Sequence, residues 1–154
     1  MQIVGQLLKR EADPILTSAL AELTAGAALD LACGGGRHAE WLAARGWRVT
    51  AVDQTPVEIP GVRFMQADLE RGEFTIEPNS WDAIVCWLYW QADLLPAIAR
   101  GVRRGGIVAL SGKTSGRFAT SLANYRAAFA GWEEIVSGED EVRAYFIASN
   151  PRPN

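Results

Sequence analysis

A glycine-rich turn that follows a short apolar segment is the part of this sequence best suited to hold a ligand. Glycines occupy positions 34–36, directly after the apolar residues 27–33, and a helix-like segment begins near Arg37. Glycines let the backbone approach a ligand closely, and the first N–H groups of a helix attract an anionic group. Asp53 ends the next apolar segment, where a carboxylate can accept the paired hydroxyls of a ribose. The spacing therefore predicts a ligand that contains a nucleoside.

Two classes of nucleoside cofactor fit this turn. Gly34, Gly36 and Ala39 satisfy the dinucleotide fingerprint with Ala in the third position, and Asp53 suits either class. Asp30, just before the turn, distinguishes them. The pyrophosphate of a dinucleotide has no use for a carboxylate there, whereas the ammonium of a methionine group can bind one, directly or through water. The pattern favours S-adenosylmethionine over a nicotinamide dinucleotide, and a purely structural role for Asp30 stays open.

Alternating apolar and amphipathic segments place this turn in a fold class. Asp13 and Pro14 have the residue types of a helix N-cap and first helical position. Helices are predicted at residues 14–24, 38–45, 93–104 and 121–130. Strands are predicted at 27–33, 47–53, 62–69, 81–89 and 107–111, with a closing antiparallel pair at 132–136 and 142–148 around Gly138. Strands that alternate with helices and are apolar on both faces indicate a largely parallel α/β sheet.

Two connections between predicted strands are too short or irregular for helices. Residues 54–61 contain two prolines, and residues 70–80 contain Gly72 and Pro78 without a helical pattern. A parallel crossover usually needs a dozen or more residues. We therefore expect two crossovers reduced to loops or single turns.

Length and charge limit the classes of partner. The 154 residues fit a single domain, expected as a helical segment at 1–26 and a sheet core at 27–154. The net charge of −3 disfavours nucleic acid and anionic membranes, which bind clustered Lys and Arg. The cluster of Arg100, Arg103 and Arg104 is interpreted as the end of a helix, where cations complement the dipole.

The sequence also indicates the cellular compartment, the redox state of the two cysteines and the absence of a metal-binding motif. No apolar stretch is long enough to span a bilayer, and residues 1–10 lack the order of a signal peptide, so we expect a cytoplasmic protein. Cys33 and Cys86, each within an apolar run, are expected to be reduced thiols. No Cys/His cluster has the spacing of a metal site.

Between residues 27 and 110 the sequence resembles the class I S-adenosylmethionine-dependent methyltransferases. Asp30-x-Ala32-x-Gly34-x-Gly36 is similar to the acidic glycine-rich motif of that family, with Ala in place of its first Gly. The other matching segments are the ribose-binding acid at Asp53, the adenine segment at 66–69, the fourth-strand motif at 81–85 and the turn at 104–106. The resemblance implies a Rossmann-like, mostly parallel sheet of seven strands, with helices on both faces and an antiparallel last strand. Small bacterial enzymes similar to tellurite-resistance methyltransferases are the nearest subgroup.

The resemblance implies a set of cofactor contacts at the carboxyl ends of the strands. They are Asp30, Ala32, Cys33, Gly34, Gly36, Arg37, His38, Asp53, Gln54, Ala67, Asp68, Leu69, Cys86 and Trp87. S-adenosylmethionine would leave as S-adenosylhomocysteine. The resemblance also makes the first and fourth strands neighbours, which implies that Cys33 and Cys86 lie close together. Trp87, Tyr89 and Trp90 follow the fourth strand, where the family places its methyl acceptor, although packing alone also explains such aromatics.

The reaction itself requires no specialised catalytic group, because an in-line displacement needs mainly alignment. Possible proton acceptors are His38, Tyr89 and Lys113, with no catalytic residue assigned. Residues 86–89 depart from the Asn/Asp-Pro-Pro-Tyr pattern of enzymes that methylate amino groups of nucleic acids, which favours a small-molecule acceptor. Two alternatives to such an enzyme remain, a nicotinamide-binding protein and a non-catalytic cofactor-binding subunit, the latter because little chain lies outside the sheet to form a lid. The oligomeric state stays open.

Overall fold

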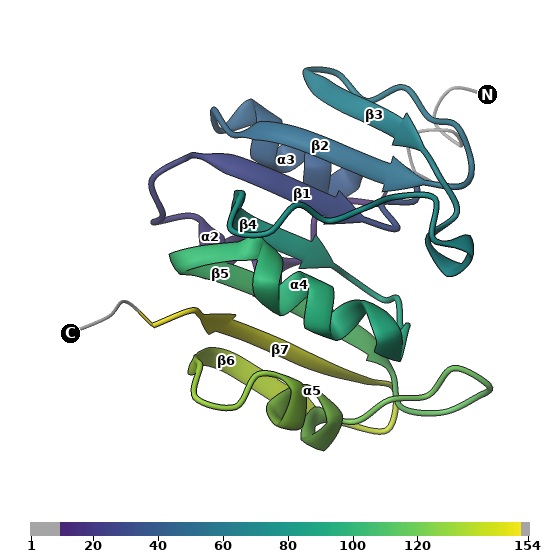
Figure 1. The fold of residues 1–154 in the computed structure, drawn as a ribbon, viewed down its shortest axis with the longest axis vertical. Coiled ribbons are helices and arrows are strands. Elements are labelled where there is room, and N and C mark those ends of the chain that lie inside the picture. Colours follow the sequence, from purple (N-terminus) through teal and green to yellow (C-terminus); the bar gives the residue numbers. More distant parts are fainter. Residues whose placement is uncertain (1–9, 152–154) are drawn as a thin grey trace.

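A seven-stranded sheet runs through the part of the chain that the computed structural model describes, residues 10–151 (Figure 1). Its strands are β1 (Ala27–Leu31), β2 (Arg48–Asp53), β3 (Val62–Gln66), β4 (Trp81–Cys86), β5 (Val102–Lys113), β6 (Glu133–Glu139) and β7 (Arg143–Ser149). The helices are α2 (Pro14–Leu20), α3 (Arg37–Ala44), α4 (Leu95–Gly101) and α5 (Leu122–Ala128), with short 3₁₀ helices η1 (Leu69–Arg71) and η2 (Ala92–Leu94).

The order of the strands across the sheet is β3-β2-β1-β4-β5-β7-β6. The first five strands of that order pair in parallel, while β7 is antiparallel to both of its neighbours. No helix joins β2 to β3, and only η1 lies between β3 and β4. The predicted Rossmann-like sheet, with its antiparallel last strand and two reduced crossovers, is confirmed.

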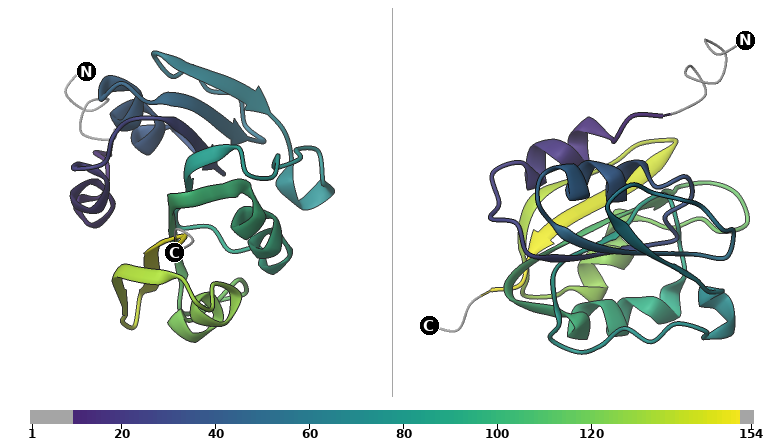
Figure 2. Two further views of the ribbon diagram at one scale, coloured as in Figure 1. Left: turned by 60° about the vertical axis from the view of Figure 1, so that its left-hand side comes forward. Right: turned by 90° about the horizontal axis from the view of Figure 1, so that it is seen from above.

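Helices cover both faces of the sheet (Figure 2). Helices α2 and α3 pack on one face, over a core that includes Leu16, Leu42 and Val85. Helices α4 and α5 pack on the other, over a core that includes Ile98 and Tyr125. Because side chains alternate along a strand, neighbouring residues of β1 and β4 belong to different cores. Asp30 therefore points to the face that carries α3.

The predicted helix at 93–104 is too long at its C-terminal end. Helix α4 ends at Gly101 and β5 begins at once, so that Arg103 and Arg104 belong to a strand. Arg103 lies 3.1 Å from Asp82 of β4 as an ion pair. Gly105 has φ +83°, and the register with β4 shifts nearby, so an irregular strand replaces the expected helix stop. The interpretation of the arginine cluster as a helix end is wrong for these two residues.

Other boundaries also differ from the sequence prediction. Strand β1 ends at Leu31 because the next residue, Ala32, adopts φ +54°. The turn between β6 and β7 lies at residues 140–142, where Asp140 accepts two backbone N–H bonds, and Gly138 is part of β6. Helix α2 stops at Leu20, and the first nine residues of the predicted N-terminal segment lie outside the described residues. Among residues 10–151 no helix is long and apolar enough to cross a membrane.

Candidate functional site

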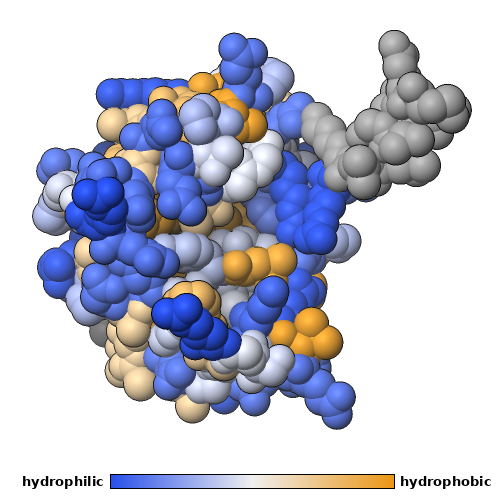
Figure 3. Space-filling view, turned by 90° about the vertical axis from the view of Figure 1, so that its right-hand side faces the viewer, coloured by the Kyte–Doolittle hydropathy of each residue, from blue (hydrophilic) through white to orange (hydrophobic). Residues whose placement is uncertain are grey.

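Two cavities open at the edge of the sheet where the parallel strands end, the face shown in Figure 3. Most of this face is hydrophilic, with small separate hydrophobic patches. The glycine-turn cavity, of about 360 Å³, is lined by Arg10, Asp30, Ala32, Cys33, Gly34, Gly35, Arg37, His38 and Trp87. The acidic cavity, of about 280 Å³, is lined by Ala32, Asp53, Gln54, Ala67, Asp68, Leu69, Glu70, Leu88 and Tyr89. Ala32 lines both, so the two cavities adjoin at the end of β1.

The turn after β1 is built from residues with positive φ. Ala32, Gly34 and Gly36 have φ of +54°, +58° and +86°. A Cβ at Gly36 would lie 2.4 Å from Cδ1 of Ile59, so only glycine fits there. Gly36 is also the N-cap of α3 and has no side chain to cap it. The first turn of α3 therefore has no cap from Gly36, and one of its N–H groups, that of Ala39, donates to Asp30.

Asp30 is a buried carboxylate with half of its hydrogen-bonding capacity unused. Its side chain is 2% exposed, and its Oδ2 has no hydrogen-bond partner. Burial raises the pKa of Asp30 to about 7, and the charge of Asp53 adds to this shift, whereas the Ala39 N–H and Arg37 oppose it. An unpaired buried carboxylate is unfavourable unless a donor or cation reaches it. Asp30 is thus suited to a cationic group in the glycine-turn cavity.

Asp53 and Asp68 stand at the ends of neighbouring strands and line the acidic cavity. Asp53 accepts an N–H bond from Gly34 (3.2 Å) through Oδ1 and one from Thr55 (3.0 Å) through Oδ2. Asp68 caps η1 by accepting the Glu70 N–H at 3.0 Å. Each carboxylate oxygen has a second lone pair, so both groups can still accept hydroxyl or amino donors.

His38 lines the glycine-turn cavity but is already bonded. It is 5% exposed, and its Nε2 accepts the backbone N–H of Asp13 at 3.1 Å. Burial and, to a lesser extent, the charge of Arg37 lower the pKa of His38 to about 4, so the imidazole is neutral. The sequence offered His38 as a possible proton acceptor, but its acceptor nitrogen is not available to receive a proton.

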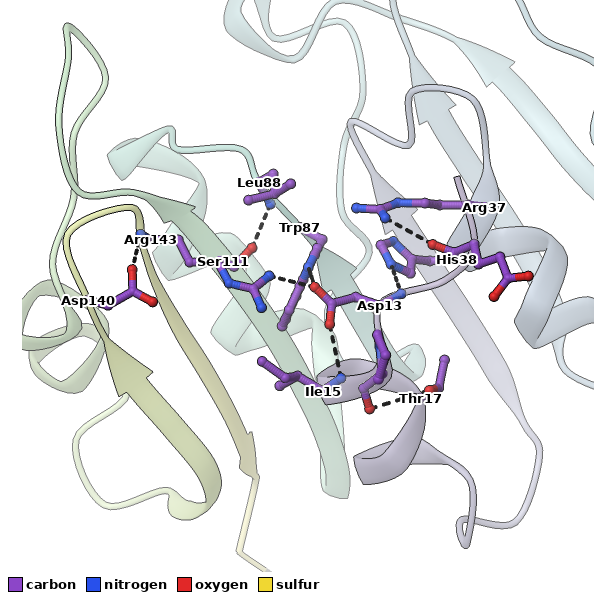
Figure 4. Close-up of polar contacts among 12 residues, drawn as sticks. Asp13, Ile15, Thr17, Arg37, His38, Trp87, Leu88, Ser111, Asp140 and Arg143 are labelled. Carbon is purple, nitrogen blue, oxygen red and sulfur yellow. Dashed lines mark hydrogen bonds and ion pairs between the residues drawn. The ribbon is translucent and has the colours of Figure 1, made fainter. Parts of the chain in front are cut away.

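Asp13 joins four segments of the chain beside this cavity (Figure 4). Its Oδ1 caps α2 at Ile15, and its Oδ2 accepts from Nε1 of Trp87 at 3.2 Å and Nη1 of Arg143 at 2.5 Å. Burial opposes ionisation, but these hydrogen bonds outweigh it and lower the pKa of Asp13. The guanidinium of Arg143 also lies 5.9 Å from the Trp87 ring. The sequence identified Asp13 only as an N-cap, because nothing local marks a partner 130 residues away.

The aromatic residues after β4 do not form one pocket. Trp87 lies in the core beneath α2 and α3 and lines the glycine-turn cavity. Tyr89 packs on the other side of the sheet and lines the acidic cavity. Trp90 packs edge-on against Tyr125 and lines neither. Leu88, between them, has φ +57°, and this conformation reverses the usual alternation of side chains.

The two cysteines lie on different sides of the sheet. Cys33 packs against the core beneath α2 and α3, and Cys86 belongs to the core beneath α4 and α5. Both are free thiols, as predicted, and their closeness stays a prediction. Burial raises the pKa of Cys33 to about 12 and that of Cys86 still further, so neither is poised as a nucleophile. Cys33 lines the glycine-turn cavity, whereas Cys86 lines neither cavity.

Of the remaining predicted residues, Gly36 and Lys113 line neither cavity, and the others line one or the other. Gln54, Ala67 and Leu69 contribute to the acidic cavity, and Arg37 to the glycine-turn cavity, where it donates to the Glu11 carbonyl at 3.0 Å. Within residues 10–151, no group of three or more His, Cys, Asp or Glu side chains is placed to hold a metal ion.

Comparison with known proteins assigns the family. A family model described as "Methyltransferase domain" matches residues 29–110, more than half of the 154-residue chain. No curated protein matches the chain. TehB from Haemophilus influenzae shares its fold with a TM-score of 0.77 and 15% identity, over 90% of this chain and 62% of that one. The chain thus spans less than two thirds of the length of TehB.

Two further solved structures match this chain over almost the whole of their own length. An S-adenosylmethionine-dependent methyltransferase from Mesorhizobium loti has a TM-score of 0.71 and 15% identity, over 88% of this chain and 96% of that one. A putative S-adenosylmethionine-dependent methyltransferase from Listeria monocytogenes has a TM-score of 0.69 and 14% identity, over 88% and 97%. The family match, the strand order and the acidic glycine-rich turn lead to the same assignment. The chain belongs to the class I S-adenosylmethionine-dependent methyltransferases.

Proposed function

We propose that this protein, acting through one domain over residues 1–154, transfers a methyl group from S-adenosylmethionine to a small-molecule acceptor. The observation that carries the proposal is the pair of cavities that adjoin at Ala32, since their linings match the two ends of this cofactor. Membership of the methyltransferase family supports the reaction class, and the linings of the two cavities support the identity of the cofactor.

The glycine-turn cavity suits the amino-acid end. The unpaired Oδ2 of Asp30 is placed to accept from an ammonium, and Arg10 and Arg37 bring guanidinium groups that complement a carboxylate. A zwitterion carries both of these charges. The pyrophosphate of a nicotinamide dinucleotide would instead meet the carboxylate of Asp30, so this lining disfavours the dinucleotide.

The acidic cavity suits the nucleoside end. Asp53 would accept the ribose hydroxyls, and Asp68 the amino group of the adenine. Apolar walls from Ala67, Leu69 and Tyr89 suit the faces of a purine ring.

The chemistry that this chain must supply is alignment. When bound, S-adenosylmethionine supplies a methyl group activated by the positive sulfur. Holding donor and acceptor in line can lower the barrier by about 7–11 kcal/mol. Asp30 and Asp53 would hold the two ends of the donor. Nε2 of His38 is occupied, and Tyr89 donates its hydroxyl proton to Gln91, so we assign neither as a general base.

Calorimetry with S-adenosylhomocysteine and, separately, NADH tests the cofactor. We expect saturable binding of S-adenosylhomocysteine and none of NADH, and the reverse result would overturn the proposal. Transfer of a labelled methyl group to a panel of small molecules then tests catalysis. Tight binding without transfer to any acceptor would favour a non-catalytic cofactor-binding subunit.

A further inference from the structure

The side chain of Gln91 connects two segments that border the acidic cavity. Its Oε1 accepts a hydrogen bond from the Tyr89 hydroxyl at 2.7 Å, and its Nε2 donates to the Leu69 carbonyl at 3.1 Å. Tyr89 and Leu69 both line the cavity, whereas Gln91 does not. Gln91 therefore acts on the shape of the cavity only through these two neighbours.

Both ends of this bridge are anchored in the backbone. The carbonyl of Gln91 accepts the Leu94 N–H at 3.0 Å at the start of η2. Leu69, only 8% exposed, begins η1, and its carbonyl also accepts the Gly72 N–H at 3.2 Å. The amide of Gln91 thus spans the starts of two 3₁₀ helices, η1 and η2. A side chain held at both ends loses little further freedom when a ligand binds.

The bridge fixes the phenol of Tyr89, whose backbone is fixed separately. The N–H of Tyr89 donates to the Ser111 carbonyl at 3.0 Å, and the N–H of Leu88 donates to the Ser111 hydroxyl at 2.7 Å. Burial raises the pKa of Tyr89 to about 12, so its hydroxyl remains a donor to Gln91 at neutral pH. Without Gln91, the half-buried phenol would be free to leave the cavity wall.

We propose that Gln91 is a positioning residue that holds Tyr89 and Leu69 as walls of the acidic cavity and thereby strengthens binding of the nucleoside. The inference rests on the proposed function, since it assumes that an adenosine group occupies this cavity. Preorganisation of the wall lowers the ordering cost of binding, and its effect is confined to the nucleoside end.

Calorimetry on the Gln91→Ala variant tests this assignment with two probes. S-adenosylhomocysteine fills both cavities, whereas 5′-methylthioadenosine lacks the amino-acid end. We expect the affinity for both probes to fall by the same factor, about tenfold. Tyr89→Phe removes only the hydroxyl that Gln91 holds. The loss of affinity in the double variant Gln91→Ala/Tyr89→Phe should therefore be smaller than the product of the losses in the two single variants.

Asn150→Ala is the matched control. It removes a side-chain amide bond of similar length, Nδ2 to the Val102 carbonyl at 3.0 Å, away from both cavities. It should leave both affinities unchanged and lower the melting temperature about as much as Gln91→Ala does.

The outcomes separate the two hypotheses. Wild-type affinity for both probes in Gln91→Ala would overturn the role of Gln91 and leave the proposed function standing. Loss of S-adenosylhomocysteine affinity alone would place the effect at the amino-acid end and also overturn it. A wild-type protein that binds neither probe would overturn the proposed function and, with it, this inference.

Discussion

The charge on Asp30 depends strongly on the surroundings of its carboxylate. Its pKa is raised to about 7, chiefly by burial, from an ordinary value of 3.8. In the ligand-free protein the folded state therefore holds a proton that the unfolded chain has released. Between these two values the contribution of Asp30 to the free energy of unfolding falls as pH rises, because at this group the unfolded state binds fewer protons.

This shift gives the first prediction. Relative to Asp30→Asn, the ligand-free wild type should lose stability between about pH 4 and 7. The lowered pKa of His38 makes stability rise with pH over part of this range in both proteins, so the difference between the two profiles isolates Asp30. The affinity for S-adenosylhomocysteine should rise from pH 6 to 8 in the wild type, because the carboxylate form accepts an ammonium. In Asp30→Asn the affinity should be about tenfold to a hundredfold lower and flat over this range. Urea unfolding and calorimetry at several pH values test both statements, and a parallel pH profile in the variant would contradict them.

Asp53 carries the second prediction. Asp53→Ala should lower the affinity for S-adenosylhomocysteine about tenfold to a hundredfold, because the carboxylate would accept ribose hydroxyls. It should also lower stability by about 1 kcal/mol, because the Gly34 and Thr55 N–H groups lose an acceptor. Asp140→Ala is a matched control, since that carboxylate also accepts two backbone N–H bonds but lines neither cavity. Equal affinities in the two variants would remove Asp53 from the site.

Single residues could be identified from the sequence only where a local motif marks them. Asp30 and Asp53 have the spacing of a nucleoside site, and the structure places both in cavity linings. Gln91 has no such mark, because its role comes from a contact 22 residues away. The same holds for Asp13 and Arg143, which meet only once the sheet has formed.

At the scale of elements, the start of α3 depends on the fit between Gly36 and the loop that follows β2. The third prediction is that Gly36→Ala destabilises the protein by about 2–4 kcal/mol, because its Cβ would overlap Ile59 and its φ is +86°. In an Ile59→Ala background the added cost should fall to about 1 kcal/mol, because only the backbone strain remains. Urea unfolding of all four proteins measures this difference. An unchanged cost in the second background would show that the contact with Ile59 is not the cause.

The start of α2 depends on Asp13, the subject of the fourth prediction. Asp13→Ala should cost about 2–4 kcal/mol, since it removes a helix cap and leaves Trp87 and Arg143 without their acceptor. Asp13→Asn keeps the cap oxygen and should cost less. Because the pKa of Asp13 is lowered, its contribution to stability is present above about pH 4 and is lost as pH falls further. Ser121→Ala, which removes only the cap of α5, is the control. An equal loss of stability in the two alanine variants would show that the bonds from Trp87 and Arg143 to Asp13 contribute nothing.

The order of helices and strands followed from apolar periodicity, but their ends did not. Strand β1 stops at Ala32 and β4 stops before Leu88, and both residues have positive φ although neither is glycine. Sequence patterns do not mark such residues, since apolar side chains normally continue a strand. The helix predicted at 93–104 ends earlier, at Gly101, for a related reason, because Gly105 supports an irregular strand rather than a helix stop.

For the whole molecule, the fold class could be predicted because it depends on the repeating pattern rather than on single contacts. A chain with apolar segments at these intervals and a glycine turn after the first one has few other ways to bury its apolar faces. The split of the site into two cavities could not be predicted, because it depends on which face each side chain takes at the end of β4.

The fifth prediction concerns global stability. At a hundred times its Kd, S-adenosylhomocysteine should add about 2.7 kcal/mol to the free energy of unfolding. For a chain of this size the melting temperature should rise by about 5–10 °C. Thermal melting measured by circular dichroism checks this, with NADH at the same concentration as the control. A shift with NADH alone would reverse the cofactor assignment.

The reversed alternation at Leu88 has a practical consequence for engineering. Trp87 and Tyr89 are two positions apart, yet they line different cavities. A protein engineer can therefore enlarge the Tyr89 side, for example with Tyr89→Ala, to accept cofactor analogues with a bulky group on the base. The charged groups around Trp87 would stay as they are, so the variant would still bind the unmodified amino-acid end of such an analogue. The variant and its analogue would then form an orthogonal enzyme–cofactor pair.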